Sequence, residues 1–424
     1  MSEIHIGGFR RLQGRIPVQG SKNGVLPIMA ASILTDETTV ITNVPAIQDV
    51  FCMMGILKFM GCGCTLKDGE LTVRPGGLNR TDLPECHVSR MRSSIVLLGA
   101  VLGRLGSAAT CYPGGCSIGK RPIDFHLQAL RALGAEIRED GCRIQARATR
   151  LRGAGIHFPY PSVGATENAL LAAVLAEGET VIQGAAREPE IEELCRFLNA
   201  MGAETAGGGT DVITVQGRKR LHGCRFAVSG DRIVAGTYLM AAMAGRGDVV
   251  LDGVKPSHLK EVLQVLEEAG ADLRISENSV AVTMKGRPSP ISVRTGPYPG
   301  FPTDLQSPLM GLLCSASGDS RIRETVFEGR YETAAELNKL GASVEVLAGE
   351  ALVHGRPFLP GGHACARDLR GGAALVIAGL GAAGETRISD CFHIERGYED
   401  ICRDLRLAGA DIQWRSQEAK EKEN

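Results

Sequence analysis

The chain has 424 residues, of which 44% are hydrophobic and 22% charged, and this composition excludes a disordered or fibrous protein. The length is sufficient for two or three domains with substantial cores. Lys and Arg number 47 against 48 Asp and Glu, so no basic excess is available to follow a nucleic-acid backbone, and we expect no nucleic-acid partner. An anionic ligand must therefore be bound by a local cluster of cations.

Membrane and disulfide classes are also disfavoured. The N-terminal segment lacks the apolar core of a secretory signal, and the longest nearly uncharged apolar run, Gly371 to Gly384, has 14 residues. A bilayer span needs roughly 18 to 20 residues. The 13 cysteines are scattered through apolar segments rather than spaced as a disulfide framework. We expect a soluble cytoplasmic protein with reduced thiols and no membrane partner.

In chain order, the predicted elements repeat with a period of about 70 residues. A Gly-Ala or Gly-Cys pair closes an amphipathic segment at Gly61, Gly134, Gly202, Gly270, Gly341 and Gly409. A turn followed by a short β-rich run recurs at Asp36, Gly106, Gly178, Gly247, Gly318 and Gly384. These two independent markers predict six copies of one unit.

Each unit begins with an apolar helix, such as residues 168–178, followed by a turn, a strand, an amphipathic helix and an alternating pair of strands. The glycine that ends the second helix fits a left-handed cap. The first helix is apolar nearly all round and the second has a polar face, so we expect the first to be buried and the second peripheral. The pattern predicts a βαβαββ-like unit with helices inside sheets.

The second unit has about three to five extra residues between its strand and its outer helix. They fall within residues 112–121, a loop that holds three glycines, Cys116 and the adjacent cations Lys120 and Arg121. Such an insertion predicts a lid. With so many cysteines, Cys116 alone could be a small buried residue, but its glycine-rich, cationic setting favours an exposed, reactive thiol.

Unusual residues stand at the starts of the six apolar helices, at Lys22, Arg92, Gly164, Ile233 (after Asp231 and Arg232), Asp304 and Arg370. Cations there oppose the helix dipole, whereas the free N–H groups favour an anion. If the six units are arranged alike, the charged members face a common space. Two alternatives remain, with Lys22 as a solvated surface residue and Asp304 as an ordinary helix N-cap.

Arg330 and Arg396 each precede the outer helix of their unit, at the place where Arg121 stands in the second unit. Surface arginines are common, and only this repeated location points to function. We predict no metal site and no cofactor, because neither a CxxC pair nor an HExxH motif occurs. His126 and His393 lack a partner at the spacing of a nucleophile triad.

A family resemblance is carried by the segments SKNGVLPIMAA, MRSSI, PGGCSIGKRPIDFH, PSVGAT, AAREPEI, DRIVAGT, FPTDLQ, ETVFEGR, DLRGGAAL and HIERGYE. Through them the chain resembles the UDP-N-acetylglucosamine 1-carboxyvinyltransferases of the enolpyruvyl transferase family, from about residue 3 to 414. The cysteine-bearing loop separates this family from the shikimate-pathway transferases, which lack it.

The resemblance implies an α/β fold of two similar globular domains, each an inside-out α/β barrel of three βαβαββ units. A double chain crossing would join them, with the active site in the cleft between. One domain would take residues 1–20 and 230–424, with units four to six and the N-terminal strand. The other would take residues 21–229, with the catalytic lid at 112–121.

The resemblance also implies a reaction, the transfer of the enolpyruvyl group of phosphoenolpyruvate to the 3′-hydroxyl of UDP-N-acetylglucosamine with release of phosphate. This is the first committed step of peptidoglycan synthesis, and it is the step that fosfomycin blocks. The resemblance therefore also implies a role in cell wall biogenesis, cell shape and cell division. Both partners would be small molecules. The oligomeric state is not predicted.

The same resemblance implies the site residues. Catalytic roles fall to Cys116, as the acid that protonates the methylene carbon, to Asp304, as the base at the hydroxyl, and to Lys22 and Arg396. Phosphate would be held by Lys22, Arg121 and Arg396, and the cationic pocket completed by Arg92, Arg330 and Arg370. The remaining substrate-binding residues would be Asn23, Pro122, Ile123, Asp124, Phe125, Ser162, Val163, Gly164, Val326 and Asp368. Position 160, a lysine near the diphosphate in some members, is Tyr160 here.

Other functions stay open at this point. A shikimate-pathway transferase or an RNA 3′-phosphate cyclase could be built on related repeats, although the lid cysteine and the neutral charge argue against them. A repeat-built clamp or binding protein would belong to a different class. It would have no use for an inserted loop with a cysteine, and it would release no phosphate.

Overall fold

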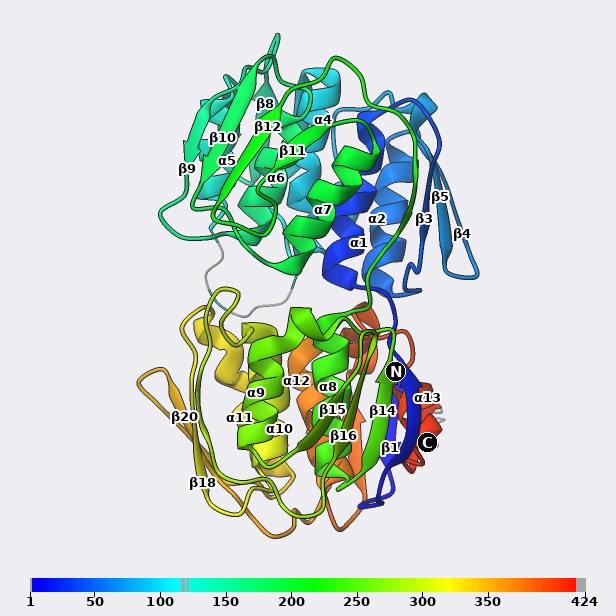
Figure 1. Ribbon diagram of the computed structural model, residues 1–424, viewed down its shortest axis with the longest axis vertical. Helices are drawn as coiled ribbons and strands as arrows, with labels where there is room; N and C mark the ends of the chain where they lie inside the picture. Colours follow the sequence, from blue (N-terminus) through cyan, green and yellow to red (C-terminus); the bar gives the residue numbers. More distant parts are fainter. Residues whose placement is uncertain (1, 116–118, 120–121, 417–424) are drawn as a thin grey trace, which may run out of the picture. The chain divides into compact units, whose positions relative to one another are not determined.

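The structure is a computed structural model that describes residues 2–115, 119 and 122–416 (Figure 1). The chain divides into two compact units. One, called the terminal unit here, combines the chain up to Gln19 with the chain from Gly230 onward. The other, called the central unit, takes most of the chain from Gly20 to Ser229.

In its described residues, the central unit contains three inner and three outer helices. The inner helices are α1 (Lys22–Ala31), α4 (Leu97–Leu105) and α6 (Val163–Ala173). The outer helices are α2 (Gln48–Phe59), α5 (Asp124–Ala132) and α7 (Pro189–Ala200), and a short helix, α3 (Glu85–Val88), precedes α4. The described strands form three sheets, of order β13-β3-β5-β4, β6-β8-β7 and β11-β12-β10-β9. Their bounds are β3 (Thr39–Thr42), β4 (Gly63–Lys67), β5 (Glu70–Arg74), β6 (Ser107–Cys111), β7 (Glu136–Asp140), β8 (Arg143–Arg147), β9 (Gly155–His157), β10 (Glu179–Gln183), β11 (Glu204–Ala206), β12 (Val212–Gln216) and β13 (Arg225–Ala227).

The terminal unit repeats this plan. Its inner helices are α8 (Arg232–Ala244), α10 (Gln306–Leu313) and α12 (Leu369–Leu380). Its outer helices are α9 (Lys260–Glu268), α11 (Glu332–Lys339) and α13 (Ile401–Leu407). The three sheets have the orders β15-β16-β14-β2, β17-β18-β20-β19 and β21-β22-β1-β23. Their bounds are β1 (Ser2–Ile6), β2 (Gln13–Pro17), β14 (Asp248–Asp252), β15 (Asp272–Ile275), β16 (Ser279–Thr283), β17 (Ser292–Arg294), β18 (Asp319–Arg323), β19 (Val344–Leu347), β20 (Glu350–His354), β21 (Gly362–Cys365), β22 (Thr386–Ser389) and β23 (Ile412–Ser416).

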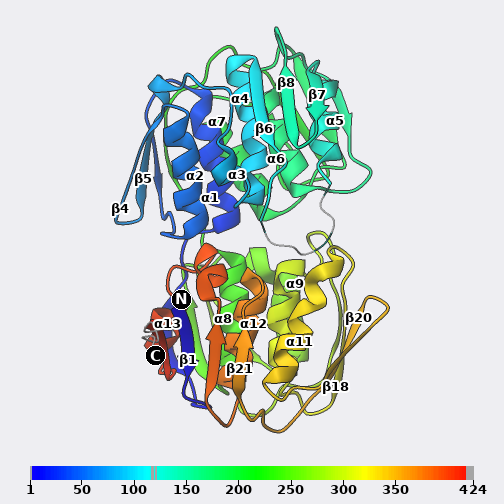
Figure 2. The same cartoon turned by 180° about the vertical axis from the view of Figure 1, so that it is seen from behind.

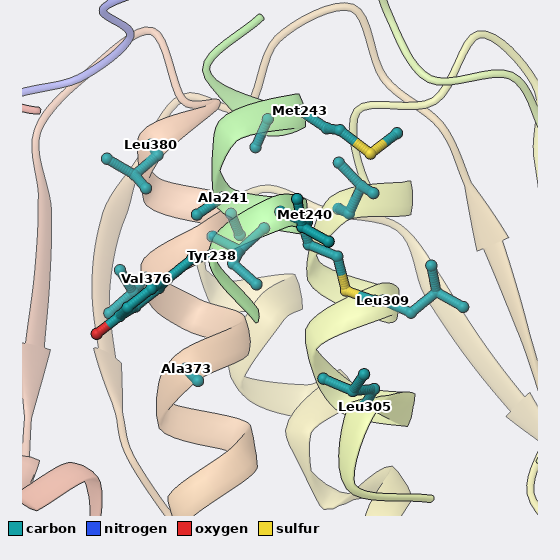
Figure 3. Close-up of a cluster of buried hydrophobic side chains, with 14 of the residues drawn as sticks. Tyr238, Met240, Ala241, Met243, Leu305, Leu309, Ala373, Val376 and Leu380 are labelled. Atoms are coloured by element: carbon teal, nitrogen blue, oxygen red, sulfur yellow. The ribbon is translucent and has the colours of Figure 1, made fainter. Parts of the chain in front are cut away.

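The predicted division into buried and peripheral helices is confirmed. Every residue of α8 and α12 is buried, whereas α9 and α13 bury only one face. In each unit the inner helices lie together with the sheets outside them, as both views show (Figures 1 and 2). In the terminal unit Tyr238 and Met240 of α8 pack beside Leu309 of α10 and Val376 of α12 (Figure 3). Each unit therefore has its own apolar core.

The inner helices approach closely where glycine leaves room. A Cβ atom on Gly99 of α4 would lie 2.3 Å from Asn168 Oδ1 on α6, and one on Gly311 of α10 would lie 2.4 Å from the carbonyl oxygen of Ala374 on α12. The two glycines occupy equivalent places, seven residues after Arg92 and Asp304 respectively. At these two positions glycine therefore allows the inner helices to pack closely.

The predicted left-handed glycines are confirmed in all six units. The φ angles of the six marker glycines lie between 86° and 103°. In this region an L side chain clashes with its own backbone, which glycine avoids. The glycine ends the outer helix and turns the chain into the next strand. The repeat signal in the sequence therefore has a direct backbone cause.

Strand pairing departs from a simple row of six units. The parallel partner of β3 is β13, which comes from the far end of the central unit, and the parallel partner of β14 is β2, near the N-terminus. β1 lies between β22 and β23 and completes the sixth sheet. In the second of the six repeats, an isolated parallel bridge joins Asp82 and Ala109. The sheets of the other five repeats have a parallel strand at this place. The repeated pattern alone does not reveal these exchanges.

The twelve described cysteines are all free thiols. Burial raises the pKa of Cys62 and of Cys195 to about 11, so these two are protonated at neutral pH and unreactive. None of the helices in the described ranges combines the length and the apolar character needed to cross a membrane.

Candidate active site

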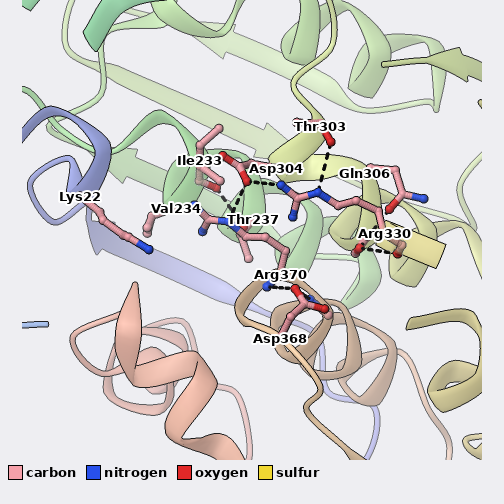
Figure 4. A network of polar contacts seen from close by, with 12 residues as sticks. Lys22, Ile233, Val234, Thr237, Thr303, Asp304, Gln306, Arg330, Asp368 and Arg370 are labelled. Atoms are coloured by element: carbon pink, nitrogen blue, oxygen red, sulfur yellow. Dashed lines mark hydrogen bonds and ion pairs between the residues drawn. The ribbon is translucent and has the colours of Figure 1, made fainter. Parts of the chain in front are cut away.

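A carboxylate and two arginines meet at the start of α10 in the terminal unit (Figure 4). Asp304 lies in the 3-10 turn η5 (Thr303–Leu305) that precedes α10. Its Oδ1 accepts a hydrogen bond from Arg330 Nη2 at 2.6 Å and lies 3.5 Å from Arg370 Nε. The side chains of both arginines are 4% exposed, whereas that of Asp304 is 28% exposed. The carboxylate is therefore the most accessible part of this cluster.

The alternative that Asp304 is a helix cap is wrong. The cap positions of η5 and α10 are Pro302 and Leu305, and neither side chain makes a capping bond. Asp304 is instead paired with buried guanidinium groups. Buried ion pairs add little net stability, because desolvation offsets the attraction. Such an arrangement in a helix-start cluster is typical of a functional site.

Arg370 is held at the start of α12, where Oδ1 of Asp368 accepts hydrogen bonds from the backbone N–H groups of Arg370 at 2.9 Å and Gly371 at 3.1 Å. Burial lowers the pKa of the Arg370 guanidinium, but the charge of Asp304 and other neighbours outweigh this and raise it. Its Nη1 has no hydrogen-bond partner among the described residues. A buried donor left without an acceptor costs about 1–3 kcal/mol, which an anionic ligand would offset.

Lys22 is the first residue of α1 in the central unit, and Ser21 caps this helix by accepting the N–H of Gly24 at 3.1 Å. Lys22 Nζ lies 2.7 Å from Asp49 Oδ2, and the two side chains are 11% and 5% exposed. The alternative of a solvated lysine is therefore wrong. Asp49 was not predicted from the sequence, although an acid beside Val50 in the first turn of an outer helix is a signal that could have indicated it.

Asn23 and Arg92 also lie at inner-helix starts of the central unit. Asn23 follows Lys22 on α1 and is partly exposed. Arg92 opens the 3-10 turn η3 (Arg92–Val96) before α4, and its guanidinium donates to the carbonyl oxygens of Pro113 and Pro122, both at 3.4 Å. These two carbonyls stand on either side of the loop that carries Cys116.

The predicted lid is only partly within the described ranges. Cys116, Lys120 and Arg121 lie outside them, so their predicted roles stay predictions. At the start of the loop, the hydroxyl of Tyr112 donates a hydrogen bond to Glu139 Oε2 at 2.7 Å.

After the lid, Asp124 begins α5 and is exposed, as is Pro122. Ile123 is buried, so its side chain packs in the core rather than facing a ligand. The ring of Phe125 lies 5.9 Å from that of Phe158, centroid to centroid. Of this predicted segment, the side chains of Pro122 and Asp124 are the most accessible to a ligand.

The predicted segment from Ser162 to Gly164 begins α6. Ser162 caps the helix, since its Oγ accepts the N–H of Ala165 at 3.4 Å. Ser162, Val163 and Gly164 are all partly exposed. Tyr160, just before them, is 42% exposed. This helix start thus lies beside the exposed side chain of Tyr160.

Three further predicted positions, Val326, Arg330 and Arg396, lie in a loop or in 3-10 turns of the terminal unit. The N–H of Val326 donates to Glu324 Oε1 at 2.7 Å, and the Val326 side chain is partly exposed. Arg330 follows in the 3-10 turn η6 (Glu328–Tyr331). Arg396 ends the 3-10 turn η7 (Cys391–Arg396) and is partly exposed. Of the residues expected to share a space, Asp304 and Arg370 do meet within this unit.

No group of three or more His, Cys, Asp and Glu side chains is placed to hold a metal ion in the ranges the structure describes. His126 lies 3.1 Å from the side-chain nitrogen of Asn168, between α5 and α6. Burial among helices explains this histidine without a catalytic role.

Comparisons with known proteins extend the resemblance over nearly the whole chain. The family model for EPSP synthase (3-phosphoshikimate 1-carboxyvinyltransferase) matches residues 6–405. The UDP-N-acetylglucosamine 1-carboxyvinyltransferase 2 of Caldanaerobacter subterraneus subsp. tengcongensis is 44% identical over 413 residues, covering 97% of this chain and 99% of the relative. The UDP-N-acetylglucosamine 1-carboxyvinyltransferase of Gluconobacter oxydans is 45% identical over 415 residues, with the same coverage.

Solved structures agree with this relationship. The enolpyruvyl transferase NikO from Streptomyces tendae superposes with a TM-score of 0.88 at 26% identity, covering 98% of this chain and 99% of that one. EPSP synthase from Acinetobacter baumannii shares the fold alone, with a TM-score of 0.74 at 21% identity, over 98% of this chain and 100% of that one. The six sheets of the described residues, the inner helices they surround and the sequence matches together show that this chain belongs to the enolpyruvyl transferase family, with the UDP-N-acetylglucosamine 1-carboxyvinyltransferases among its relatives.

Proposed function

We propose that this protein transfers the enolpyruvyl group of phosphoenolpyruvate to the 3′-hydroxyl of UDP-N-acetylglucosamine and releases phosphate. The observation that carries the proposal is the partly exposed carboxylate of Asp304, held between the buried guanidinium groups of Arg330 and Arg370. A base that must accept a proton from an alcohol has to be both accessible and fixed. The relatives that are 44% identical bear the name of this activity.

The cations are proposed to bind the phosphate and carboxylate groups of phosphoenolpyruvate. Lys22, Arg121 and Arg396 would hold the phosphate, and Arg92, Arg330 and Arg370 would complete the pocket. The unpartnered Nη1 of Arg370 supports this, since it is a donor in want of an acceptor. Two opposite unit charges 4 Å apart attract by about 4 kcal/mol at an effective dielectric of about 20, before desolvation. A nearly neutral protein therefore needs such a cluster to bind a trianion.

The sugar nucleotide would contact the residues around the starts of α1, α5 and α6. This set consists of Asn23, Pro122, Ile123, Asp124, Phe125, Ser162, Val163 and Gly164, together with Asp304, Val326 and Asp368 of the terminal unit. Ile123 would contribute through its backbone, because its side chain is buried. Asp368 already caps α12, so its contribution would be to hold Arg370 in place.

The reaction is proposed to proceed by addition and elimination. Cys116 gives a proton to the methylene carbon of phosphoenolpyruvate, which places positive charge on the adjacent carbon. The 3′-oxygen bonds to that carbon while Asp304 takes its proton. The Cys116 thiolate then takes a proton back from the new methyl group, the bond to the phosphate oxygen breaks, and the enol ether departs. The leaving phosphate receives the proton that Asp304 took from the hydroxyl, so both groups return to their starting states. One thiol and one carboxylate suffice for these transfers.

In this proposal Cys116 must be a protonated thiol to act as the acid, and the bound substrate favours that protonated form. Nearby cations favour the thiolate, which is reactive but cannot donate a proton. A bound trianion would offset those cations and favour the thiol. Thiol titration with and without phosphoenolpyruvate tests this point, and an unchanged titration would contradict it. A phosphonate epoxide of the fosfomycin kind should alkylate the thiolate, and Cys116→Asp should escape alkylation while keeping part of the activity.

In the cell this activity would belong to the cytoplasm and to peptidoglycan synthesis, and thereby to cell shape and division. Both substrates are soluble and highly charged, which fits an enzyme that meets them in solution.

The deciding experiment measures free phosphate after the protein is mixed with phosphoenolpyruvate and UDP-N-acetylglucosamine. We expect phosphate release with this pair, together with an enolpyruvyl ether product by mass spectrometry. Replacing the sugar nucleotide with shikimate 3-phosphate should give none. Phosphate release with shikimate 3-phosphate alone, or with neither acceptor, would overturn the proposal.

A further inference from the structure

The side chain of Gln19 joins two parts of the terminal unit that are far apart in sequence. Gln19 follows β2, is 8% exposed, and is the last residue of the terminal unit before the chain enters the central unit. Its Nε2 donates to the carbonyl oxygen of Gly397 at 3.0 Å, and its Oε1 accepts the N–H of Glu399 at 2.9 Å. One amide thus holds the backbone on both sides of Tyr398.

The backbone of Gln19 is tied as well. Its carbonyl oxygen accepts the N–H of Asp231 at 2.8 Å. Asp231 in turn caps α8, since its Oδ1 accepts the N–H groups of Ile233 at 2.8 Å and Val234 at 3.0 Å. Gln19 is therefore fixed to the start of an inner helix, and it can act as a rigid anchor for the segment from Gly397 to Glu399.

The segment from Gly397 to Glu399, which Gln19 holds, contacts the candidate site. Tyr398 is 1% exposed, and its hydroxyl lies 2.9 Å from Thr237 Oγ1 on α8. The guanidinium carbon of Arg370 lies 6.0 Å from the centroid of the Tyr398 ring. On the other side, Gly397 directly follows Arg396, the last residue of η7. Any movement of the clasped backbone would shift both Arg396 and the ring beside Arg370.

From these contacts we propose that Gln19 is a positioning residue for anion binding, which sets the placement of Arg396 and of the Tyr398 ring against Arg370. The inference rests on the proposed function, in which both arginines bind phosphoenolpyruvate. The side-chain hydrogen bonds of Gln19 go to the backbone of Gly397 and Glu399, so Gln19 acts on both arginines through the backbone. A one-ångström shift of a cation weakens the binding of a charged group steeply.

The test uses Gln19→Met, which keeps the length of the side chain and removes both hydrogen bonds. We expect the KM for phosphoenolpyruvate to rise roughly tenfold, the size of about one or two lost hydrogen bonds. The KM for UDP-N-acetylglucosamine should stay within about twofold. Equilibrium dialysis with phosphoenolpyruvate should show the same loss of affinity without turnover.

A matched control is available in the same unit. Asn338 also clasps backbone through its amide, donating to the carbonyl oxygen of Val344 at 2.9 Å and accepting its N–H at 2.8 Å. Asn338→Leu removes an equal pair of bonds away from Arg396. We expect it to lower the melting temperature without changing the KM for phosphoenolpyruvate. Equal KM values in both variants would overturn the inference and leave Gln19 as a structural residue.

A second variant covers the case in which Gln19→Met does not fold. Gln19→Glu keeps an acceptor for Glu399, and its carboxyl regains an O–H donor toward Gly397 only when protonated. The ratio of its KM for phosphoenolpyruvate to that of the wild type should therefore fall as the pH is lowered. A ratio that does not change with pH would contradict the inference. A wild-type protein that releases no phosphate would overturn the proposed function, whereas an active wild type with an unchanged variant would overturn only the role of Gln19.

Discussion

Arg330 donates from Nη2 to Oδ1 of Asp304 at 2.6 Å, and this bond joins the turn before an outer helix to the turn before an inner helix. Nε of Arg330 also donates to the hydroxyl of Thr303 at 3.1 Å. The guanidinium is thus fixed at two points, and it holds the carboxylate at one orientation. A base that is held in this way loses no free energy to reorientation when the reaction begins.

Asp304→Asn should abolish most of the phosphate release while keeping the fold. The amide can still accept a bond from Arg330, but it cannot take a proton, and we expect turnover to fall by about 10²–10⁴. Two buried guanidinium groups would lose their negative partner, at a cost of about 2–4 kcal/mol in the free energy of unfolding. Turnover and urea unfolding measure the two effects separately.

The control for this change is Asp252→Asn. Asp252 accepts from Arg15 Nε at 3.0 Å and Nη2 at 2.6 Å, but both side chains are well exposed. Exposed pairs contribute about 0–1 kcal/mol, so stability and turnover should barely change. Turnover of Asp304→Asn within tenfold of the wild type would contradict its role as the base.

Lys22→Met should destabilise the central unit as well as stop the reaction. It leaves the buried carboxylate of Asp49 without its 2.7 Å partner, and breaking a buried pair costs about 3–5 kcal/mol. The double variant Lys22→Met/Asp49→Leu removes the stranded charge and should regain part of that stability. Neither variant should release phosphate. If the double variant is as active as the wild type, Lys22 has no role in binding.

Because Glu167 is buried, we expect the free energy of unfolding to fall as the pH rises. Glu167 lies in α6, and burial, followed by the charges of Glu190 and Glu188, raises its pKa well above the ordinary value. The folded protein therefore binds this proton more tightly than the unfolded chain. Its contribution to stability is present below the unfolded pKa of about 4.5 and is lost as the pH rises toward the folded pKa. Each unit of that rise corresponds to about 1.4 kcal/mol.

Glu167→Gln should remove this pH dependence and raise the stability at pH 8 relative to the wild type. Urea midpoints between pH 5 and pH 8 measure the difference. Glu177→Gln serves as the control, since Glu177 is exposed and pairs with Arg150 at 3.2 Å. Parallel pH curves for the wild type and Glu167→Gln would show that this carboxyl does not titrate in the window.

Replacing a left-handed glycine with alanine should lower the free energy of unfolding more than replacing a glycine elsewhere. At Gly134 the φ angle is 93° and a Cβ atom would meet nothing within 4 Å, so Gly134→Ala isolates backbone strain from crowding. We expect a loss of about 1–2 kcal/mol. Gly155 has equally open space and lies in β9 without a positive φ, so Gly155→Ala should change stability by less than about 0.5 kcal/mol. Equal effects would show that the caps do not need glycine.

Part of the candidate site could be predicted from the sequence, because the repeat places charged residues at equivalent helix starts. Lys22, Asp304 and Arg370 were picked out as charges at the starts of apolar helices, and the structure finds them buried or paired there. Asp49 was not predicted, because its partner Lys22 lies on another helix. Gln19 was not predicted, because its partners Gly397 and Glu399 are distant in sequence. The predicted roles of Cys116 and Arg121 rest on the family resemblance and on their place in the inserted loop.

The sequence by itself determined the six repeats, the buried and peripheral helices, and the left-handed glycines, because these follow from hydrophobic periodicity and from local backbone sterics. Only the tertiary structure decided that β13 pairs with β3, that β2 pairs with β14, and that β1 completes the sixth sheet. It alone also decided that Asp304 is held by guanidinium groups rather than capping a helix. Strand partners and ion pairs depend on groups brought together from distant parts of the chain, and no local pattern encodes which of several similar edges or charges will meet.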